Sequence, residues 1–247
     1  MTISPSFLDR PGGSRLAYRH RAGTSPTTVF LPGFMSDMEG GKAVALDLWA
    51  ERTGRAMLRL DYSGCGASGG AFEDGTLAIW RDDVLHVIDT LTEGPLLLVG
   101  SSMGGWLMLL VALARPERVA GLVGLAAAPD FTDWGFDEAA RDRLRRDGRI
   151  EEPSDYVDQP MIKTLGFWES GQANLLLGGE IAIDSPVRLL HGQRDPDVPW
   201  TVALRLAETL RSADVQTILV KDGDHRLSRD PDIALLIGTV ERLLEGL

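Results

Sequence analysis

The chain has 247 residues, of which 44% are apolar, and it carries a formal net charge of −11. This length suits one α/β domain with a small insertion, and the negative charge argues against nucleic acid or an anionic membrane as a partner. The single cysteine, Cys65, excludes an intrachain disulfide and a metal cluster held by cysteines. Residues 1–13 lack the apolar core of a secretory signal, and no later apolar run reaches the ~20 residues of a membrane span. We therefore expect a cytoplasmic protein without a membrane span.

Short apolar runs alternate with longer helical segments along the chain. The apolar runs predict strands at 28–31, 56–60, 96–99, 119–127, 187–190 and 216–220. The segments between them predict helices at about 41–53, 77–92, 104–114, 199–211 and 231–245, and in the second of these the apolar residues recur at three- and four-residue steps. This alternation indicates βαβ units, and hence an α/β fold with a mostly parallel central sheet flanked by helices.

The predicted strand at 96–99 runs into Gly100-Ser101-Ser102-Met103-Gly104, which fits G-x-S-x-G, and a predicted helix follows directly. A sharp strand-to-helix turn of this kind holds its central serine in a strained backbone and lifts the hydroxyl above the sheet. The pattern therefore predicts Ser102 as a nucleophile; the alternative is a glycine- and serine-rich turn without chemistry. Ser101 is a rival hydroxyl, but the extended backbone expected there points its side chain elsewhere.

A tetrahedral intermediate at Ser102 needs two N–H donors for its negative oxygen. The N–H of Met103, directly after the nucleophile, is one predicted donor. The other is the N–H of Phe34, in the turn that follows the predicted strand at 28–31, with Met35 as the alternative donor. A plain proline-glycine turn without this role is the remaining interpretation.

The segment from 130 to 185 interrupts the alternation, because it holds no clean strand and is punctuated by Pro153, Pro160 and the paired glycines 178–179. More than about 50 residues is too long for a simple crossover between two strands. We therefore expect a core domain formed by residues 1–129 and 186–247, with a small, mainly helical lid inserted at 130–185.

Within this lid, Trp134 and Trp168 are candidate walls of an acyl pocket, although such aromatic residues could instead only join the lid to the core. Arg145 lies between Arg141 and Arg149 at four-residue steps, so one helix face is basic. This face could meet an anionic substrate group, or it could be a solvated face balanced by neighbouring acids. Trp134, Trp168 and Arg145 are therefore the candidate substrate-binding residues.

The turn after the predicted strand at 187–190 offers two candidate acids, Asp195 and Asp197. Asp195 comes first after the strand, and Pro196 restricts it to an extended backbone. Asp197 stands at the expected start of a helix, where its simplest role is that of an N-cap. We favour Asp195 as the acid that orients the base, with Asp197 as the alternative.

A serine nucleophile needs a base, and the chain has only four histidines. His225 lies in the loop between the last predicted strand and the last predicted helix. This place and the chain order Ser, Asp, His are typical of a triad built on a G-x-S-x-G turn. His20 is expected on the surface, His86 on a solvated helix face and His191 as a residue that packs a turn, so His225 is the predicted base.

Seven segments of the chain resemble one known family. They are Leu31–Ser36, Asp61–Gly64, Trp80–Val84, Gly100–Leu109, Arg188–Gly192, Val198–Trp200 and Asp224–Arg226. From Leu16 to its C-terminus the chain resembles the mitochondrial α/β-hydrolases known as palmitoyl-protein thioesterases and as mycophenolic acid acyl-glucuronide esterases. The resemblance implies the α/β-hydrolase fold, a triad of Ser102, Asp195 and His225, and oxyanion donors at Phe34 and Met103. It also implies hydrolysis of thioesters or activated esters. In lacking an Arg-rich presequence, the chain resembles a bacterial relative of this family.

Together these features predict a serine hydrolase of esters or thioesters that works through an acyl-enzyme, without a cofactor and without a metal. The expected partner is a small-molecule acyl ester or thioester, or an acylated cysteine on a protein. The same triad could instead cleave C–C bonds or carry out perhydrolysis. A non-catalytic binding protein on this fold is a further alternative, which the retention of all three triad residues disfavours.

Overall fold

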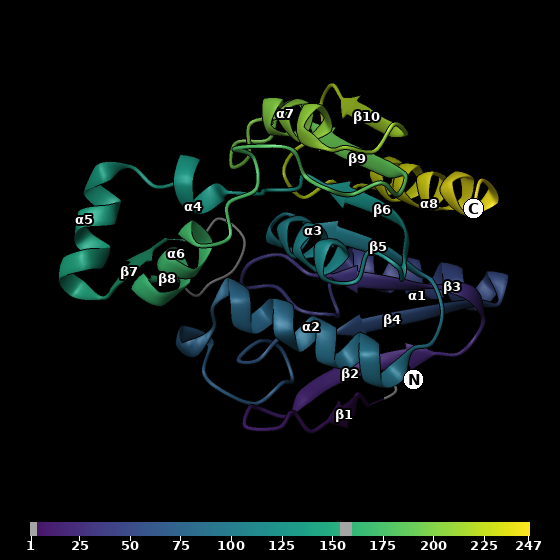
Figure 1. Cartoon of the computed structure of the whole chain (residues 1–247), viewed down its shortest axis with the longest axis horizontal. Coiled ribbons are helices and arrows are strands. Elements are labelled where there is room, and N and C mark those ends of the chain that lie inside the picture. The colour runs from purple at the N-terminus through teal and green to yellow at the C-terminus, as the bar shows by residue number, and fades with distance from the viewer. Residues whose placement is uncertain (1–3, 154–159) are drawn as a thin grey trace.

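A central sheet dominates the computed structural model, which describes residues 4–153 and 160–247 (Figure 1). Its strands are β1 (Ser6–Leu8), β2 (Leu16–Arg21), β3 (Thr24–Leu31), β4 (Arg55–Leu60), β5 (Leu96–Ser101), β6 (Val119–Leu125), β9 (Val187–Gly192) and β10 (Val215–Val220). They lie in the order β1-β2-β4-β3-β5-β6-β9-β10. Only the β1–β2 and β2–β4 pairs are antiparallel, so the predicted mostly parallel α/β fold is confirmed.

Helices cover both faces of this sheet and bury them, which explains the continuous apolar runs in its strands. On one face lie α1 (Gly41–Thr53) and α8 (Asp230–Glu245), which pack on side chains such as Leu97 and Val99 of β5. On the other lie α2 (Leu77–Leu91), α3 (Met103–Ala114) and α7 (Thr201–Thr209), which pack on the alternate side chains Leu96 and Leu98. A short 3₁₀ helix, η1 (Phe72–Asp74), precedes α2. Among the described helices, none combines the length and the apolar character needed to cross a bilayer.

The segment between β6 and β9 forms a separate group of small elements at one side of the sheet (Figure 1). It contains α4 (Phe131–Trp134), α5 (Glu138–Asp147), β7 (Arg149–Glu152), β8 (Met161–Thr164) and α6 (Leu165–Gln172). Phe136, Leu144 and Ile150 form a small core of their own there. The prediction that this segment holds no strand is wrong, because β7 and β8 form an antiparallel pair. Each is four residues long, polar or mixed in composition and paired only with the other, so neither has the apolar run that predicts a strand of the central sheet.

Two strands at the antiparallel edge of the sheet, β1 and β2, were also not predicted. The first has three residues, and the second, Leu-Ala-Tyr-Arg-His-Arg, is apolar only in its first half. β2 pairs with β4, and β1 pairs with β2, so the two strands extend the sheet at one edge. They lie away from the candidate triad, because Ser102 follows β5 and the loops after β9 and β10 lie on the other side of β5 in the strand order.

Candidate active site

The turn between β5 and α3 holds Ser102 in a backbone conformation that residues with a side chain rarely adopt. Its φ is 54° and its ψ is −120°. Such a conformation costs on the order of 1–3 kcal/mol and persists only where the surroundings enforce it. The N–H of Ser102 donates to the carbonyl of Leu125 at 2.9 Å, and the Ser102 carbonyl accepts from the N–H groups of Gly105 at 2.9 Å and Ala128 at 3.1 Å. The end of β6 and the first turn of α3 therefore hold the serine in place.

Two glycines explain why only G-x-S-x-G fits this turn. A Cβ added at Gly100 would collide with the carbonyl of Gly104, and a Cβ added at Gly104 would collide with the carbonyl of Leu31. The nucleophile turn thus packs backbone against backbone on the end of β3. This close approach sets the position of Ser102 relative to the turn that follows β3.

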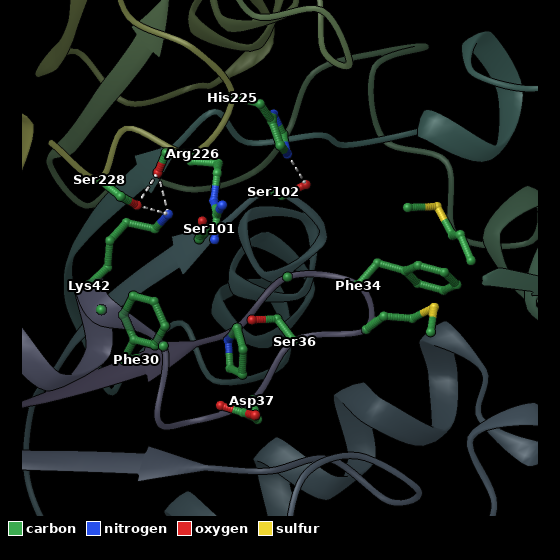
Figure 2. A pocket seen from close by; sticks show the side chains of 16 residues that line it. Phe30, Phe34, Ser36, Asp37, Lys42, Ser101, Ser102, His225, Arg226 and Ser228 are labelled. Atoms are coloured by element: carbon green, nitrogen blue, oxygen red, sulfur yellow. Dashed lines mark hydrogen bonds between the residues drawn. The ribbon is translucent and has the colours of Figure 1, made fainter. Parts of the chain in front are cut away.

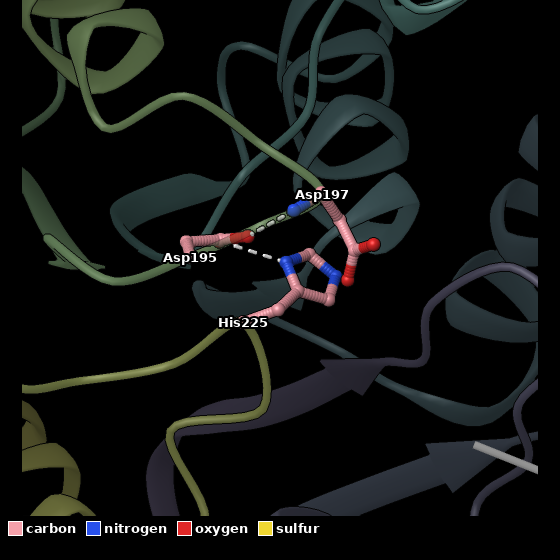
Figure 3. A group of neighbouring side chains, drawn as sticks. All are labelled: Asp195, Asp197 and His225. Atoms are coloured by element: carbon pink, nitrogen blue, oxygen red, sulfur yellow. Dashed lines mark hydrogen bonds and ion pairs between the residues drawn. The ribbon is translucent and has the colours of Figure 1, made fainter. Parts of the chain in front are cut away.

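The structure brings Ser102, His225 and Asp195 together from three separate segments. Nε2 of His225 lies 3.0 Å from Oγ of Ser102 (Figure 2). Nδ1 of the same ring lies 2.8 Å from Oδ2 of Asp195 (Figure 3). With Nδ1–H donating to the carboxylate, Nε2 is the nitrogen that accepts from the serine hydroxyl. This arrangement can remove a proton from Ser102 and hold it on the imidazole.

Asp195, rather than Asp197, contacts the imidazole Nδ1, and its buried side chain is held by several donors. Oδ1 accepts from the N–H of Asp197 at 2.9 Å and from the N–H of Val198 at 2.8 Å. Burial alone would raise the pKa of Asp195, but hydrogen bonds from His191 and His225 lower it well below its usual range. The carboxylate therefore stays ionised opposite the base.

Asp197 does not cap a helix, so its predicted N-cap role is wrong. Helix α7 begins at Thr201, and its N-cap residue is Trp200. The helix thus begins four residues beyond the aspartate, and the N–H of Asp197 instead donates to Oδ1 of Asp195. The Asp197 side chain is exposed beside His225 (Figure 3).

His191 packs a turn, as expected, but its contact with Asp195 was not predicted. It is fully buried at the end of β9, and its Nε2 donates to the carbonyl of Val198 at 2.9 Å and lies 3.2 Å from Oδ2 of Asp195. The same N–H thus supports both the carboxylate and the turn that carries it. The sequence signal for this contact was only the place of His191 at a strand end, four residues before the predicted acid.

The turn after β3 lies directly against Ser102. A Cβ at Gly33 would lie 3.4 Å from Cβ of Ser102, and the N–H of Ser36 donates to the Gly33 carbonyl at 3.2 Å. The buried Tyr62 hydroxyl donates to the Pro32 carbonyl at 3.0 Å and holds this turn in place. Phe34 belongs to this turn, and Met103 is the first residue of α3, where an N–H has no acceptor inside its own helix.

A cavity of about 220 Å³ opens beside Ser102 and His225 (Figure 2). Its apolar lining comes from Phe30, Phe34, Met35 and Met161, and its charged lining comes from Asp37, Lys42 and Arg226. Among the described residues between β6 and β9, Met161 of β8 is the one that lines the cavity. The cavity is therefore formed mainly by the loops that follow β3 and β10.

The structure places Trp134, Trp168 and Arg145 outside this cavity. Nε1 of Trp134 donates to the carbonyl of Pro129 at 2.8 Å, and Nε1 of Trp168 donates to the carbonyl of Thr132 at 3.0 Å. The Arg145 guanidinium lies 5.3 Å from the centre of the Trp168 ring and pairs with Glu138 and Asp142 at 3.2 and 2.8 Å. These contacts hold the inserted segment together, which agrees with the alternatives in which the aromatic residues join elements and the basic face is balanced by acids.

One group of side chains in the described residues has the spacing of metal ligands. Ligand atoms of Asp195, Asp197 and His225 lie within 4.8 Å of one another (Figure 3). Both oxygens of Asp195 already accept N–H donors, and His225 uses Nδ1 for one of them. The donor set therefore suits a hydrogen-bonded acid and base better than a metal centre.

The chain is similar to known proteins over nearly its whole length. Residues 29–149 match a family model described as the alpha/beta hydrolase fold. The human protein named palmitoyl-protein thioesterase ABHD10, mitochondrial, is 41% identical over 99% of this chain and 81% of its own length. A structure of alpha/beta hydrolase domain-containing protein 10 from mouse has a TM-score of 0.92 at 40% identity, covering 99% of both chains. A putative hydrolase from Agrobacterium vitis has a TM-score of 0.91 at 39% identity, covering 98% of this chain and 99% of its own.

These relatives contradict the expected cytoplasmic location. The relatives from Homo sapiens, Pongo abelii and Bos taurus are all named as mitochondrial proteins. The expectation rested on the absence of a targeting segment near residue 1, and an absent segment is not positive evidence for any compartment. The cytoplasmic prediction is therefore wrong.

The close backbone packing of the nucleophile turn leads to a prediction about stability. Gly104→Ala should lower the free energy of unfolding by about 2 kcal/mol or more, because the new methyl group would meet the Leu31 carbonyl and the backbone must shift. Urea unfolding followed by circular dichroism would measure this. Gly178→Ala is the matched control, since nothing lies within 4 Å of a Cβ at that exposed position. Equal stability of the two variants would contradict the packing argument.

Proposed function

Because the chain belongs to the α/β-hydrolase family, we propose that it is a serine hydrolase that cleaves carboxylic esters or thioesters. The observation that carries this proposal is the continuous series of contacts from Oγ of Ser102 through His225 to the buried Asp195. A hydroxyl, an imidazole and an ionised carboxylate in this order form the machinery of covalent acyl transfer.

In the proposed reaction Ser102 attacks the carbonyl carbon of the substrate while Nε2 of His225 accepts the hydroxyl proton. The tetrahedral intermediate collapses to an acyl-enzyme when the C–O or C–S bond breaks, and His225 gives its proton to the departing alcohol or thiol. A water molecule then attacks the acyl-enzyme while His225 takes a proton from it. When the second tetrahedral intermediate collapses, His225 returns this proton to Oγ of Ser102 and the carboxylic acid leaves. Every proton is returned, so the cycle needs no co-reactant other than water.

The negative oxygen of each intermediate would accept hydrogen bonds from the N–H groups of Phe34 and Met103. Support for this assignment is the contact between the Gly33 turn and Ser102, together with the place of Met103 at the start of α3. Met35, whose φ is 52°, is the alternative donor from the same turn.

The proposed substrate is an acyl group on an alcohol or a thiol, and an acylated cysteine of a protein belongs to this class. The mammalian relatives, which are 41% identical, are named palmitoyl-protein thioesterases. In this chain the acyl chain would extend from Ser102 along the apolar lining that Phe34, Met35 and Met161 provide.

The first test of this function is the nucleophile. Ser102→Ala should abolish hydrolysis of p-nitrophenyl butyrate and covalent labelling by a fluorophosphonate, because no oxygen remains to attack. Ser101→Ala, which removes the neighbouring hydroxyl and leaves Ser102 in place, should keep most of both activities. If Ser101→Ala is the inactive variant, the nucleophile is misassigned.

A second test separates the two aspartates. Asp195→Asn should lower kcat by on the order of 10²–10⁴, because the imidazole would lose both its charge partner and the acceptor that fixes its tautomer. Asp197→Asn should cost less than about tenfold, since its backbone N–H, which supports Asp195, is retained. Stopped-flow measurement of p-nitrophenol release gives both values, and equal losses would leave the orienting acid unassigned.

A third test concerns His191 as a positioning residue. His191→Phe removes the donor that lies 3.2 Å from Asp195, so more of the negative charge of the carboxylate acts on His225. The midpoint of the pH–rate profile should therefore move to higher pH, and kcat should fall by about 10-fold. His191→Gln, which keeps a side-chain N–H, should restore part of both. A purely structural role would instead lower Tm in both variants and leave the midpoint of the profile unchanged.

A further inference from the structure

The loop that joins β3 to α1 forms one wall of the cavity beside Ser102 (Figure 2). Its residues 32–37 and 40 line the cavity, and they include Phe34, whose N–H is a proposed oxyanion donor. Met38 belongs to the same loop, and its side chain is buried. The position of this wall therefore depends on how the backbone around Met38 is held.

Two side chains of opposite charge at the end of β4 hold the backbone of Met38. Oδ1 of Asp61 accepts the N–H of Met38 at 2.7 Å, and Nη1 of Arg59 donates to the carbonyl of Met38 at 2.6 Å. Asp61 is 1% exposed and Arg59 is 4% exposed, so both hydrogen bonds are charge-assisted and shielded from water. We call these two side chains the Met38 clamp, and it fixes the loop four residues after Phe34.

A glycine-rich turn encloses the carboxylate of Asp61. Oδ2 accepts the N–H of Ala67 at 2.8 Å, and the hydroxyl of Ser68 donates to the backbone carbonyl of Asp61 at 2.7 Å. Gly66 has a φ of 50°, and a Cβ added there would lie 2.2 Å from Oδ2. Each oxygen of the carboxylate thus accepts an N–H. An amide in its place would have to turn its own NH₂ group toward one of these donors.

Both members of the clamp carry a desolvation cost. Burial raises the pKa of Asp61, while the two N–H groups that it accepts act against this shift. Nη2 of Arg59 pairs with Oδ2 of Asp47 at 3.1 Å, but Nε of Arg59 is buried and has no hydrogen-bond partner among the described residues. Apolar side chains could fill such places at a lower cost in free energy. The two charges are therefore better explained by what they hold than by the stability they add.

We propose that Asp61 and Arg59 are positioning residues of the candidate active site, which hold the loop so that the N–H of Phe34 points at the negative oxygen of each tetrahedral intermediate. This proposal rests on the proposed function, and it adds two residues that do not line the cavity. An oxyanion donor must be held within about 0.5 Å of its productive place. Loss of the clamp should slow the chemical step much more than it weakens substrate binding, because the donors stabilise mainly the transition state.

The first test is Asp61→Asn, which keeps the size of the side chain and removes its charge. We expect kcat for p-nitrophenyl butyrate to fall by about 10- to 100-fold while KM stays within about threefold. Formation and hydrolysis of the acyl-enzyme both pass through an oxyanion, so the two steps should slow together and KM should change little. The expected loss is smaller than the roughly 10²–10³-fold cost of removing an oxyanion donor outright.

A matched pair of ketones separates positioning from a loss of folded protein. Oγ of Ser102 adds to the carbonyl carbon of butyl trifluoromethyl ketone, its proton passes to Nε2 of His225, and the former carbonyl oxygen becomes negative. Butyl methyl ketone binds as a planar ketone. In Asp61→Asn the inhibition constant of the fluorinated ketone should rise by about 10- to 100-fold, and that of butyl methyl ketone should stay within about threefold. An inhibition constant does not depend on the folded fraction of the sample, so partial unfolding would move neither value.

Asp83→Asn is the matched control. Asp83 of α2 is also buried, and burial raises its pKa as well. Its Oδ2 accepts the N–H of Ser63 at 2.8 Å, and its Oδ1 lies 2.8 Å from Nη1 of Arg10, so neither contact is with the loop after β3. This variant should lose stability but leave the ratio of the two inhibition constants unchanged.

The other half of the clamp gives an independent test, which also decides the matter if Asp61→Asn does not fold. Arg59→Met removes the donor to the Met38 carbonyl and should raise the inhibition constant of the fluorinated ketone alone. Arg59→Lys keeps a cationic donor and should restore part of the parent's affinity for it.

The outcomes distinguish the clamp from the function. If Asp61→Asn and Arg59→Met leave both inhibition constants unchanged, or shift both ketones equally, the positioning role is overturned and the proposed function stands. The same holds if Asp83→Asn shifts the fluorinated ketone as much as Asp61→Asn does. If Ser102→Ala binds the fluorinated ketone as tightly as the parent, the proposed function fails independently of the clamp.

Discussion

The site depends on a single close approach of two backbone turns. Gly104 lies so near the carbonyl of Leu31 that no Cβ fits between them, and Ser102, two residues before Gly104, has a positive φ. Because β3 and β5 are neighbours in the sheet, their turns meet at the same edge. This contact places the serine hydroxyl and the Gly33 turn within one small volume, and the remaining residues of the site are arranged around it.

The carboxylate of Asp195 is the second constraint, because a buried charge must be compensated. The donors are two backbone N–H groups of its own turn, the ring of His225 and the ring of His191. The turn therefore has to close tightly after β9, and His191 stabilises this closure by also donating to the Val198 carbonyl. The same hydrogen bonds therefore stabilise the folded turn after β9 and hold the carboxylate that contacts the imidazole of His225.

Much of the fold and of the candidate site could be predicted from the sequence, because the signals for them lie in short segments of the chain. Apolar runs gave six strands of the central sheet, and the fold and the family resemblance are confirmed. The strands β7 and β8 were missed because they lack an apolar face and form only by pairing with each other. His191 was judged from its neighbours in the chain, whereas its role depends on how the loop after β9 folds back. Lys42 and Arg226 are 184 positions apart, and only the tertiary structure brings them to one cavity.

The inserted segment packs on the turn that carries Phe34, the residue whose N–H is a proposed oxyanion donor. The ring of Phe34 lies 4.9 Å from the ring of Phe167 in α6 and 6.2 Å from the ring of Phe131 in α4, centre to centre. From the core, Phe34 contacts the rings of Phe72 and Trp80 at 5.2 and 6.0 Å. A side chain held between both groups has little rotational freedom, which would help to keep the proposed N–H donor of the same residue in place. The insertion is thereby coupled to the proposed oxyanion donor, whereas the charged side chains that line the cavity come from the core.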